Sequence, residues 1–234
     1  MFFQDYTDKQ VATQVVVNGE LAPRILNAGG AEVWGFEMDL SWQPSFFEGL
    51  TLGGGYTYLD AEYTEFIVES ASLQRAAGNG FCDVVTVAPG TPDESLTCAY
   101  NFAGRKLERT PEHAVVLTGN YTRQFANSDF DWFVDFNASW QDERFQSEDN
   151  FVKFDDFWLV DARLGITGDT WEAIAYVDNV FDDDTVRTGG SGPDFGQQVT
   201  ETGFLAGFGI SHWFANLPDP RTFGVRATYR FGAE

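Results

Sequence analysis

The side chains best suited to metal binding or to a covalent link are two cysteines and two histidines. Cys82 and Cys98 lie 16 positions apart in a stretch rich in glycine, proline, threonine and aspartate, and the histidines are His113 and His212. A zinc site would need more ligands than this stretch supplies. We predict instead a disulfide between Cys82 and Cys98 that closes an exposed loop, which fits an oxidising compartment.

A second group of polar residues offers oxygen atoms to a hard cation. Residues 178–184 contain four aspartates and one asparagine, Asn179. Calcium is bound by several oxygen ligands, but an EF-hand needs a regular spacing with a glycine and a distant glutamate, which this stretch lacks. We interpret the stretch as a strand end that runs into a solvated loop and predict no metal site. Calcium binding is the alternative.

Catalytic motifs are missing from the sequence. There is no Gly-x-Ser-x-Gly nucleophile elbow, and Ser211 and His212 are adjacent rather than parts of a triad. We therefore predict that the chain is not an enzyme and has no cofactor. Residues 203–214 are unusually apolar for a loop. An extra hairpin that caps a pore is the favoured interpretation, and direct ligand contact through aromatic anchors is the alternative.

The composition limits the classes of partner and of fold. The net charge is −22 with only three lysines, which argues against a nucleic-acid partner because such proteins carry a basic surface. No run of about 18 apolar residues exists, so a transmembrane helix is excluded. Aromatic residues reach 16% while all hydrophobic residues reach only 43%. That combination is typical of membrane β-barrels, whose rings lie at the two interfaces and whose lumen-facing residues are polar.

Alternation of apolar and polar residues indicates β-strands along the whole chain. In residues 130–141 apolar side chains alternate with polar ones, and Phe133 is the only exception. Short turns are expected near residues 44–49, 125–129 and 168–170. Longer connections are expected near residues 18–28, 67–104, 142–150 and 182–219. The eight predicted strands cover residues 1–17, 34–42, 50–58, 115–122, 130–141, 158–166, 171–177 and 223–231.

The two faces of these strands have different chemistry. One face is apolar and is expected to meet lipid, and the other is expected to line a wet lumen. Arg226 and Arg230 fall on the lumen face and are expected to pair with Glu37, Asp39, Asp135 or Asp161. Glycines on this face are expected to fill space poorly: Gly35, Gly53, Gly55, Gly165 and Gly224. The predicted lipid-facing residues are Trp34, Phe36, Leu40, Trp132, Phe136, Trp158, Val160 and Tyr229.

Five segments, in the same order, resemble the carboxy-terminal part of TonB-dependent outer-membrane receptors. Residues 27–37 are similar to a segment in which Asn-x-Gly precedes a Gly-x-Glu strand. Residues 55–63 resemble the following outward strand. The other three segments are similar to the return strand, the penultimate strand and the closing strand, and they are residues 109–113, 176–182 and 220–231.

The resemblance implies an all-β fold, an antiparallel transmembrane β-barrel. The chain would be one domain, residues 1–234, and the carboxy-terminal segment of a 22-stranded barrel with a plugged lumen. Residues 1–6 do not resemble a signal peptide, and no plug domain is seen. The closing strand implies a signal for the barrel assembly machinery at Phe223, Val225, Tyr229 and Phe231.

The function implied by the resemblance is import of a scarce nutrient, such as a ferric siderophore, across the bacterial outer membrane. The partners would be outer-membrane lipid, the small ligand, and TonB acting through the absent plug. The alternative is a self-contained eight-stranded barrel with a structural or adhesive role. Eight is an even number, which allows closure, but a small barrel must fill its interior with side chains. The inner-face glycines favour the wide barrel.

Overall fold

The computed structural model describes residues 1–17, 20–27, 29–69, 84–87, 96–148, 150–193 and 211–232. All regular elements in these ranges are β-strands. No helix in the same ranges is long and apolar enough to cross a membrane. The all-β class predicted from the alternating sequence pattern is therefore confirmed.

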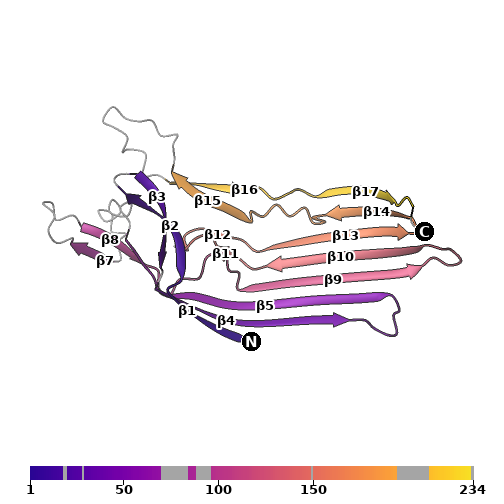
Figure 1. Cartoon of the computed structure of the whole chain (residues 1–234), viewed down its shortest axis with the longest axis horizontal. Helices are drawn as coiled ribbons and strands as arrows, with labels where there is room; N and C mark the ends of the chain where they lie inside the picture. Colours follow the sequence, from indigo (N-terminus) through magenta and orange to yellow (C-terminus); the bar gives the residue numbers. More distant parts are fainter. Residues whose placement is uncertain are drawn as a thin grey trace, which may run out of the picture.

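A single antiparallel sheet of eight strands forms the body of the molecule (Figure 1). The strands lie side by side in chain order, as in an up-and-down meander, and this confirms the predicted number of eight strands. Within the described residues no pairing joins the first strand to the last, so the sheet is open. The strands are β1 (Phe2–Thr7), β4 (Gly30–Trp42), β5 (Leu50–Glu65), β9 (His113–Gln124), β10 (Asp131–Gln141), β13 (Phe157–Thr167), β14 (Trp171–Asp178) and β17 (Thr222–Tyr229).

The two ends of the sheet differ. Short turns join β4 to β5, β9 to β10 and β13 to β14 at one end, whereas the opposite end carries long connections with small sheets of their own (Figure 1). Short turns on one side and long loops on the other are characteristic of outer-membrane barrels. The additional strands are β2 (Gln10–Val17), β3 (Glu20–Asn27), β6 (Ile67–Glu69), β7 (Val84–Val87), β8 (Leu96–Asn101), β11 (Arg144–Phe145), β12 (Lys153–Phe154), β15 (Thr188–Pro193) and β16 (Ser211–Asn216).

The prediction of one strand over residues 1–17 is wrong. β1 ends at Thr7, and Asp8 has a φ of 59°, a left-handed conformation that turns the chain out of the main sheet. β2 then pairs with β3, which occupies much of the connection expected at residues 18–28. A valine-rich segment favours strand structure wherever it finds a partner, so alternation alone does not show which sheet it joins.

The strand register sets two faces of the sheet, and the predicted lipid-facing residues share one of them. Phe36 of β4 lies opposite Tyr58 of β5, and Trp140 of β10 lies opposite Trp158 of β13. Several of these apolar side chains are exposed, among them Leu40 at 65%. The stretch from Trp34 to Trp42 is nine residues long, which is the length of strand needed to cross a bilayer. This face therefore has the dimensions and chemistry of a lipid-facing wall.

Aromatic rings cover three of the inner-face glycines. Phe133, the exception to the alternation in β10, lies directly opposite Gly165, and a Cβ at Gly165 would collide with its ring. The ring of Phe2 covers Gly35 in the same way. A Cβ at Gly224 would lie 2.7 Å from the Tyr176 hydroxyl on β14. The expectation that these inner glycines leave empty space is therefore wrong at three of the five positions, because rings on neighbouring strands fill it.

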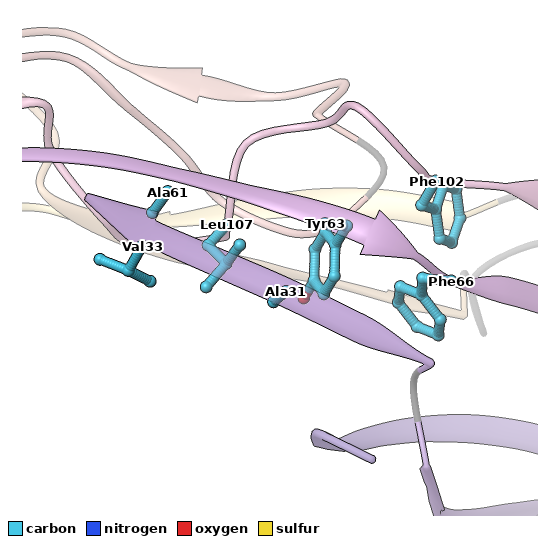
Figure 2. Close-up of a cluster of buried hydrophobic side chains, with 7 residues drawn as sticks. All are labelled: Ala31, Val33, Ala61, Tyr63, Phe66, Phe102 and Leu107. Atoms are coloured by element: carbon cyan, nitrogen blue, oxygen red, sulfur yellow. The ribbon is translucent and has the colours of Figure 1, made fainter. Parts of the chain in front are cut away.

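The buried hydrophobic core lies at the long-loop end of β4 and β5 (Figure 2). Residues 102–107 run beside β5, where Tyr63 N donates to Arg105 O at 2.9 Å and Leu107 N donates to Ala61 O at 3.0 Å. Tyr63 and Phe66 are almost fully buried. This packing holds residues 102–107 against the long-loop end of the main sheet. The cluster consists of Ala31, Val33, Ala61, Tyr63, Phe66, Phe102 and Leu107.

The face assignment predicts opposite outcomes for one substitution at two nearby positions of β10. Val134→Arg places a charge among lipid-facing side chains and should cost roughly 2–4 kcal/mol of folding free energy in a bilayer. Asn137→Arg, on the inner face, should cost little. Urea titration of folding into lipid vesicles measures both. Equal costs would show that the faces are assigned wrongly.

Candidate functional site

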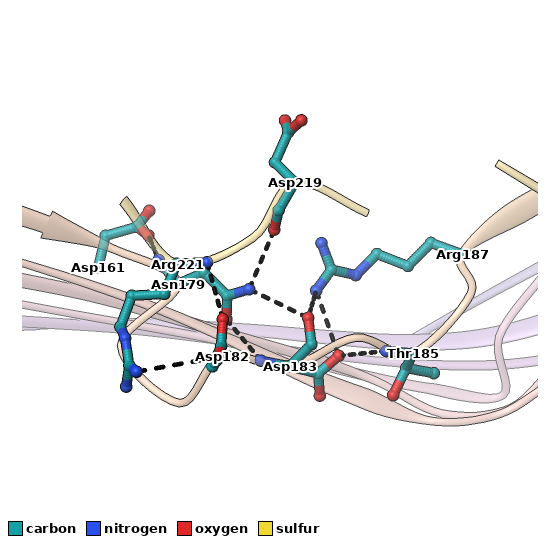
Figure 3. A network of polar contacts seen from close by, with 8 residues as sticks. All are labelled: Asp161, Asn179, Asp182, Asp183, Thr185, Arg187, Asp219 and Arg221. Carbon is teal, nitrogen blue, oxygen red and sulfur yellow. Dashed lines mark hydrogen bonds and ion pairs between the residues drawn. The ribbon is translucent and has the colours of Figure 1, made fainter. Parts of the chain in front are cut away.

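The candidate site is the inner side of the sheet at its long-loop end, and one part of it is organised by Asn179. This residue follows β14, is 4% exposed and has a φ of 53°. Asparagine tolerates this left-handed conformation better than most residues. Its backbone N donates to Asp161 Oδ1 at 2.9 Å, which ties the turn after β14 to the neighbouring strand β13 (Figure 3).

The Asn179 side chain joins two loop segments. Its Nδ2 donates to the backbone oxygens of Asp183 at 3.0 Å and Asp219 at 3.2 Å. Its Oδ1 accepts from Asp183 N at 2.9 Å. Buried amide groups are expensive to leave unpaired, and here both ends of the amide are satisfied. The result is a rigid connection between the start of the loop after β14 and the approach to β17.

The neighbouring carboxylates point to arginines. Asp182 Oδ1 accepts from Arg221 N at 2.9 Å, and Asp183 Oδ1 lies 3.3 Å from Arg187 Nη2 (Figure 3). Among the described residues no three acidic, histidine or cysteine side chains come together in a way that would hold a metal ion. Asp182 and Asp183 are thus bonded to Arg221 and Arg187 within the loop segments.

Two arginines and two phenylalanines form a second cluster beside this network. Arg144 Nη2 donates to Arg187 O at 2.6 Å, which joins β11 to the segment before β15. The guanidinium carbons of Arg144 and Arg187 lie 5.7 and 4.6 Å from the centre of the Phe157 ring. Phe154 and Phe157 are buried. Burial lowers the pKa of the Arg144 guanidinium, although it stays charged at neutral pH.

A third group surrounds Lys106, on the segment that leads to β9. Asp60 lies opposite Trp34, so this group is at the long-loop end but on the outer face of the sheet. Lys106 Nζ lies 2.6 Å from Asp60 Oδ1 and 3.1 Å from Glu62 Oε1. Burial lowers the pKa of Lys106, but the hydrogen bonds to these two carboxylates outweigh it, and the net shift is upward. A cavity of about 190 Å³ lies next to Lys106 and is also lined by Glu112 and other residues. It is smaller than typical small-molecule sites.

The opening hairpin is attached to the wall by a polar contact. Tyr63 Oη donates to Glu108 Oε2 at 2.5 Å, and Lys9 Nζ lies 3.9 Å from Glu108 Oε1. Lys9 also lies 4.8 Å from the centre of the Tyr63 ring. Since Lys9 immediately precedes β2, these contacts fix the point where the hairpin leaves the sheet.

Several residues singled out in the sequence fall outside this arrangement. Cys82 lies outside the described residues, as does the side chain of Cys98, so the disulfide remains a prediction. Residues 203–210 also lie outside them, whereas Ser211–Asn216 forms β16 and pairs with β15 as a hairpin. The side chain of His212 is not described, and His113 stacks on Tyr56.

The expected pairing of Arg226 and Arg230 with acids across the wall is not seen. Within the ranges that the structure describes, neither arginine forms an ion pair with Glu37, Asp39, Asp135 or Asp161. Asp135 accepts instead from Asn120, and Asp161 accepts from the backbone of Asn179. For Glu37 and Asp39 the physical reason is distance. β17 is the last strand of an open sheet, and β4, which carries Glu37 and Asp39, lies near the opposite edge.

Sequence reasoning missed the arginine–phenylalanine cluster and the role of Asn179 as the centre of a network. Arg144 and Arg187 are 43 positions apart, and no local pattern links them. For Asn179 a signal existed, because an asparagine at a strand end followed by aspartates is typical of a side chain that bonds to nearby backbone.

Comparison with known proteins gives a consistent picture. Residues 1–180 match the family model described as TonB-dependent receptor-like, β-barrel. The ferric yersiniabactin uptake receptor FyuA from Yersinia pestis has 15% identity and a TM-score of 0.59 over 97% of this chain and 26% of its own. The ferric-catecholate import receptor Fiu from E. coli K12 has 20% identity and a TM-score of 0.54 over 98% and 24%. The chain thus spans about a quarter of the length of these solved structures.

The Asn179 network predicts a specific loss of stability. Asn179→Ala removes three side-chain hydrogen bonds at a buried site and should cost about 1–3 kcal/mol, concentrated in the loop after β14. Hydrogen exchange of residues 180–188 measures the effect. Asp184→Ala, at an exposed neighbouring position, is the matched control and should change little. Unchanged protection in the Asn179 variant would contradict the network, and calcium-dependent protection in the parent would restore the calcium interpretation.

Proposed function

The chain belongs to the TonB-dependent receptor β-barrel family, and we propose that it forms the carboxy-terminal wall of a receptor that imports a scarce nutrient such as a ferric siderophore. The family consists of outer-membrane receptors and transporters, so the expectations of an outer-membrane location and of a non-enzymatic role are confirmed. The identity of the nutrient and its route are part of the proposal.

The observation that carries the proposal is the open eight-stranded sheet with one apolar face and one polar face. A sheet of this kind supplies part of a wall, and the family's barrel of 22 strands encloses a lumen wide enough for a plug. The long connections gather at one end, where a ligand from outside would first meet the protein (Figure 1). Solved structures with a similar fold include a ferric yersiniabactin uptake receptor and a siderophore receptor, and this supports the proposed nutrient class.

In the proposed mechanism each part of this chain has a separate task. The loop end, held by the Asn179 network and the buried cluster around Tyr63 and Phe66, contributes to ligand capture. Energy supplied through TonB moves a plug domain contributed by another part of the receptor and so opens the lumen. The apolar face of the sheet anchors the wall in lipid. This chain therefore takes part in capture and passage, while coupling to TonB belongs to the plug.

The last strand has a further proposed role in assembly. Phe223, Val225, Tyr229 and Phe231 lie on one face and are 79%, 78%, 58% and 89% exposed. An exposed aromatic strand at the edge of the sheet offers both side chains and unpaired backbone groups to a partner. We propose that the barrel assembly machinery recognises this strand before the barrel closes.

Uptake of ferric siderophores by cells tests the proposed function. A strain lacking the receptor that contains this chain should lose uptake of one radiolabelled ferric siderophore, and the restored gene should recover it only when TonB is present. Tyr229→Ala combined with Phe231→Ala should lower both uptake and the amount of receptor in the outer membrane. Thr228→Ala, on the inner face of β17, is the control.

Two results would count against the proposal. If loss of the gene leaves the uptake of every tested ferric siderophore unchanged, the proposed import function is wrong. Normal receptor levels in the membrane with the Tyr229 and Phe231 substitutions would remove the assembly role but leave import standing. The amount of receptor is read from the heat-modifiable band on a gel.

A further inference from the structure

Two buried polar atoms in the described part of the chain have no hydrogen-bond partner, and they belong to neighbouring arginines. They are Arg144 Nη1 and Arg187 Nε. Buried polar groups in native proteins are nearly always paired, so each exception calls for an explanation, such as an ion that binds there. That both exceptions fall in one cluster suggests a common cause.

The two guanidinium groups are held together by the fold. Arg144 Nη2 donates to Arg187 O at 2.6 Å, and both groups pack on the ring of Phe157. Arg144 also lies 5.8 Å from the centre of the Phe154 ring. Guanidinium planes stack readily on aromatic faces, which limits their freedom while leaving N–H groups to donate in the plane. The cluster is therefore built to hold two positive charges in a fixed orientation.

The charge of the cluster is not balanced. Arg187 lies 3.3 Å from Asp183, and this is the one ion pair that either arginine forms within the described residues. Asp183 is itself shared with Thr185 N at 3.0 Å. Two guanidinium charges thus face one carboxylate, in a chain whose net charge is −22. Among the described residues Arg144 has no carboxylate within ion-pair distance, and this favours an anion as its partner.

The cluster lies on the route that a ligand would take. Phe157 begins β13 and is opposite Gln141, on the polar inner face of the sheet and at its long-loop end. The Arg187 side chain is 20% exposed, so the pair is open to solvent on one side. Arginine presents N–H groups in a planar fork that matches the oxygens of carboxylate and phosphate groups.

We propose that Arg144 and Arg187 form an oxyanion site at the mouth of the lumen, which takes a carboxylate or phosphate group of a small molecule. Binding turns Arg187 toward the anion, and the unpaired N–H groups then gain acceptors. The anion site is inferred from the structure without the proposed function. The further statement that the imported ligand carries the anionic group rests on the proposed function.

Calorimetric titration of the receptor that contains this chain, purified in detergent at low salt, tests the site. The probes are citrate for carboxylates and inorganic phosphate for phosphates. At least one probe should bind, and Arg144→Met or Arg187→Met should each weaken it about tenfold or more, since a charge-assisted hydrogen bond is lost. Arg123→Met is the control, because Arg123 pairs with Glu48 at the opposite, short-turn end of the sheet and should leave affinity unchanged.

Further variants separate the site from folding and from import. Arg144→Lys keeps the charge without the fork and should bind with intermediate affinity, and its heat-modifiable gel band reports that the barrel is intact. Stronger citrate binding assigns a carboxylate ligand, and stronger phosphate binding assigns a phosphate. Absence of binding by the parent protein, or unchanged affinity in both methionine variants, would overturn the proposal. Anion binding by a receptor that imports no ferric siderophore would instead overturn the proposed function alone.

Discussion

The constraint on which the rest of this structure depends is that a backbone inside a bilayer has no water to bond with. Each unpaired N–H or C=O group in lipid costs several kcal/mol, so every spanning strand must be paired along both edges. From β5 to β14 each strand of the main sheet is paired on both sides. β4 is paired with β5 from Gly30 to Trp42, but with β1 only from Gly30 to Gly35. In the described part of the sheet, the outer edges of β1 and β17 have no strand beside them. Those two edges require neighbouring strands.

The two faces of the sheet follow from the same geometry, because side chains alternate along a strand. On the outer face apolar side chains stay exposed, as Leu40 and Leu164 do at 65% and 55%. On the inner face, rings fill the space above glycines, as Phe133 does over Gly165. Each of these glycines leaves room for an aromatic ring from a neighbouring strand, so the two strands pack closely. Asn120 and Asp135 form a polar contact on the inner face of β9 and β10. At the long-loop end, Asn179 and the two arginines organise the loops.

The sequence allowed the main sheet to be predicted almost strand by strand, because alternation over nine or more residues is a strong local signal. It did not allow the boundary at Thr7 to be predicted, because the alternation continues into β2 although Asp8 directs the chain elsewhere. Phe133 was recognised as an exception, but its meaning required Gly165, which is 32 positions away on the next strand. Arg144 and Arg187 meet only when two loops fold together, and Arg226 lacks its expected partners because sheet order sets distance. Strands and their two faces could therefore be predicted from the sequence, whereas contacts between distant loops could not.

The central claim is that these eight strands are part of a wider wall, and refolding tests it most directly. The 234-residue chain is diluted from urea into detergent micelles and examined by size-exclusion chromatography, protease challenge and gel mobility before and after heating. With two unpaired edges the chain should aggregate or remain protease-sensitive, and it should become ordered only when the missing strands are supplied. A monodisperse, protease-resistant monomer whose mobility changes on heating would contradict the account and establish a self-contained eight-stranded barrel.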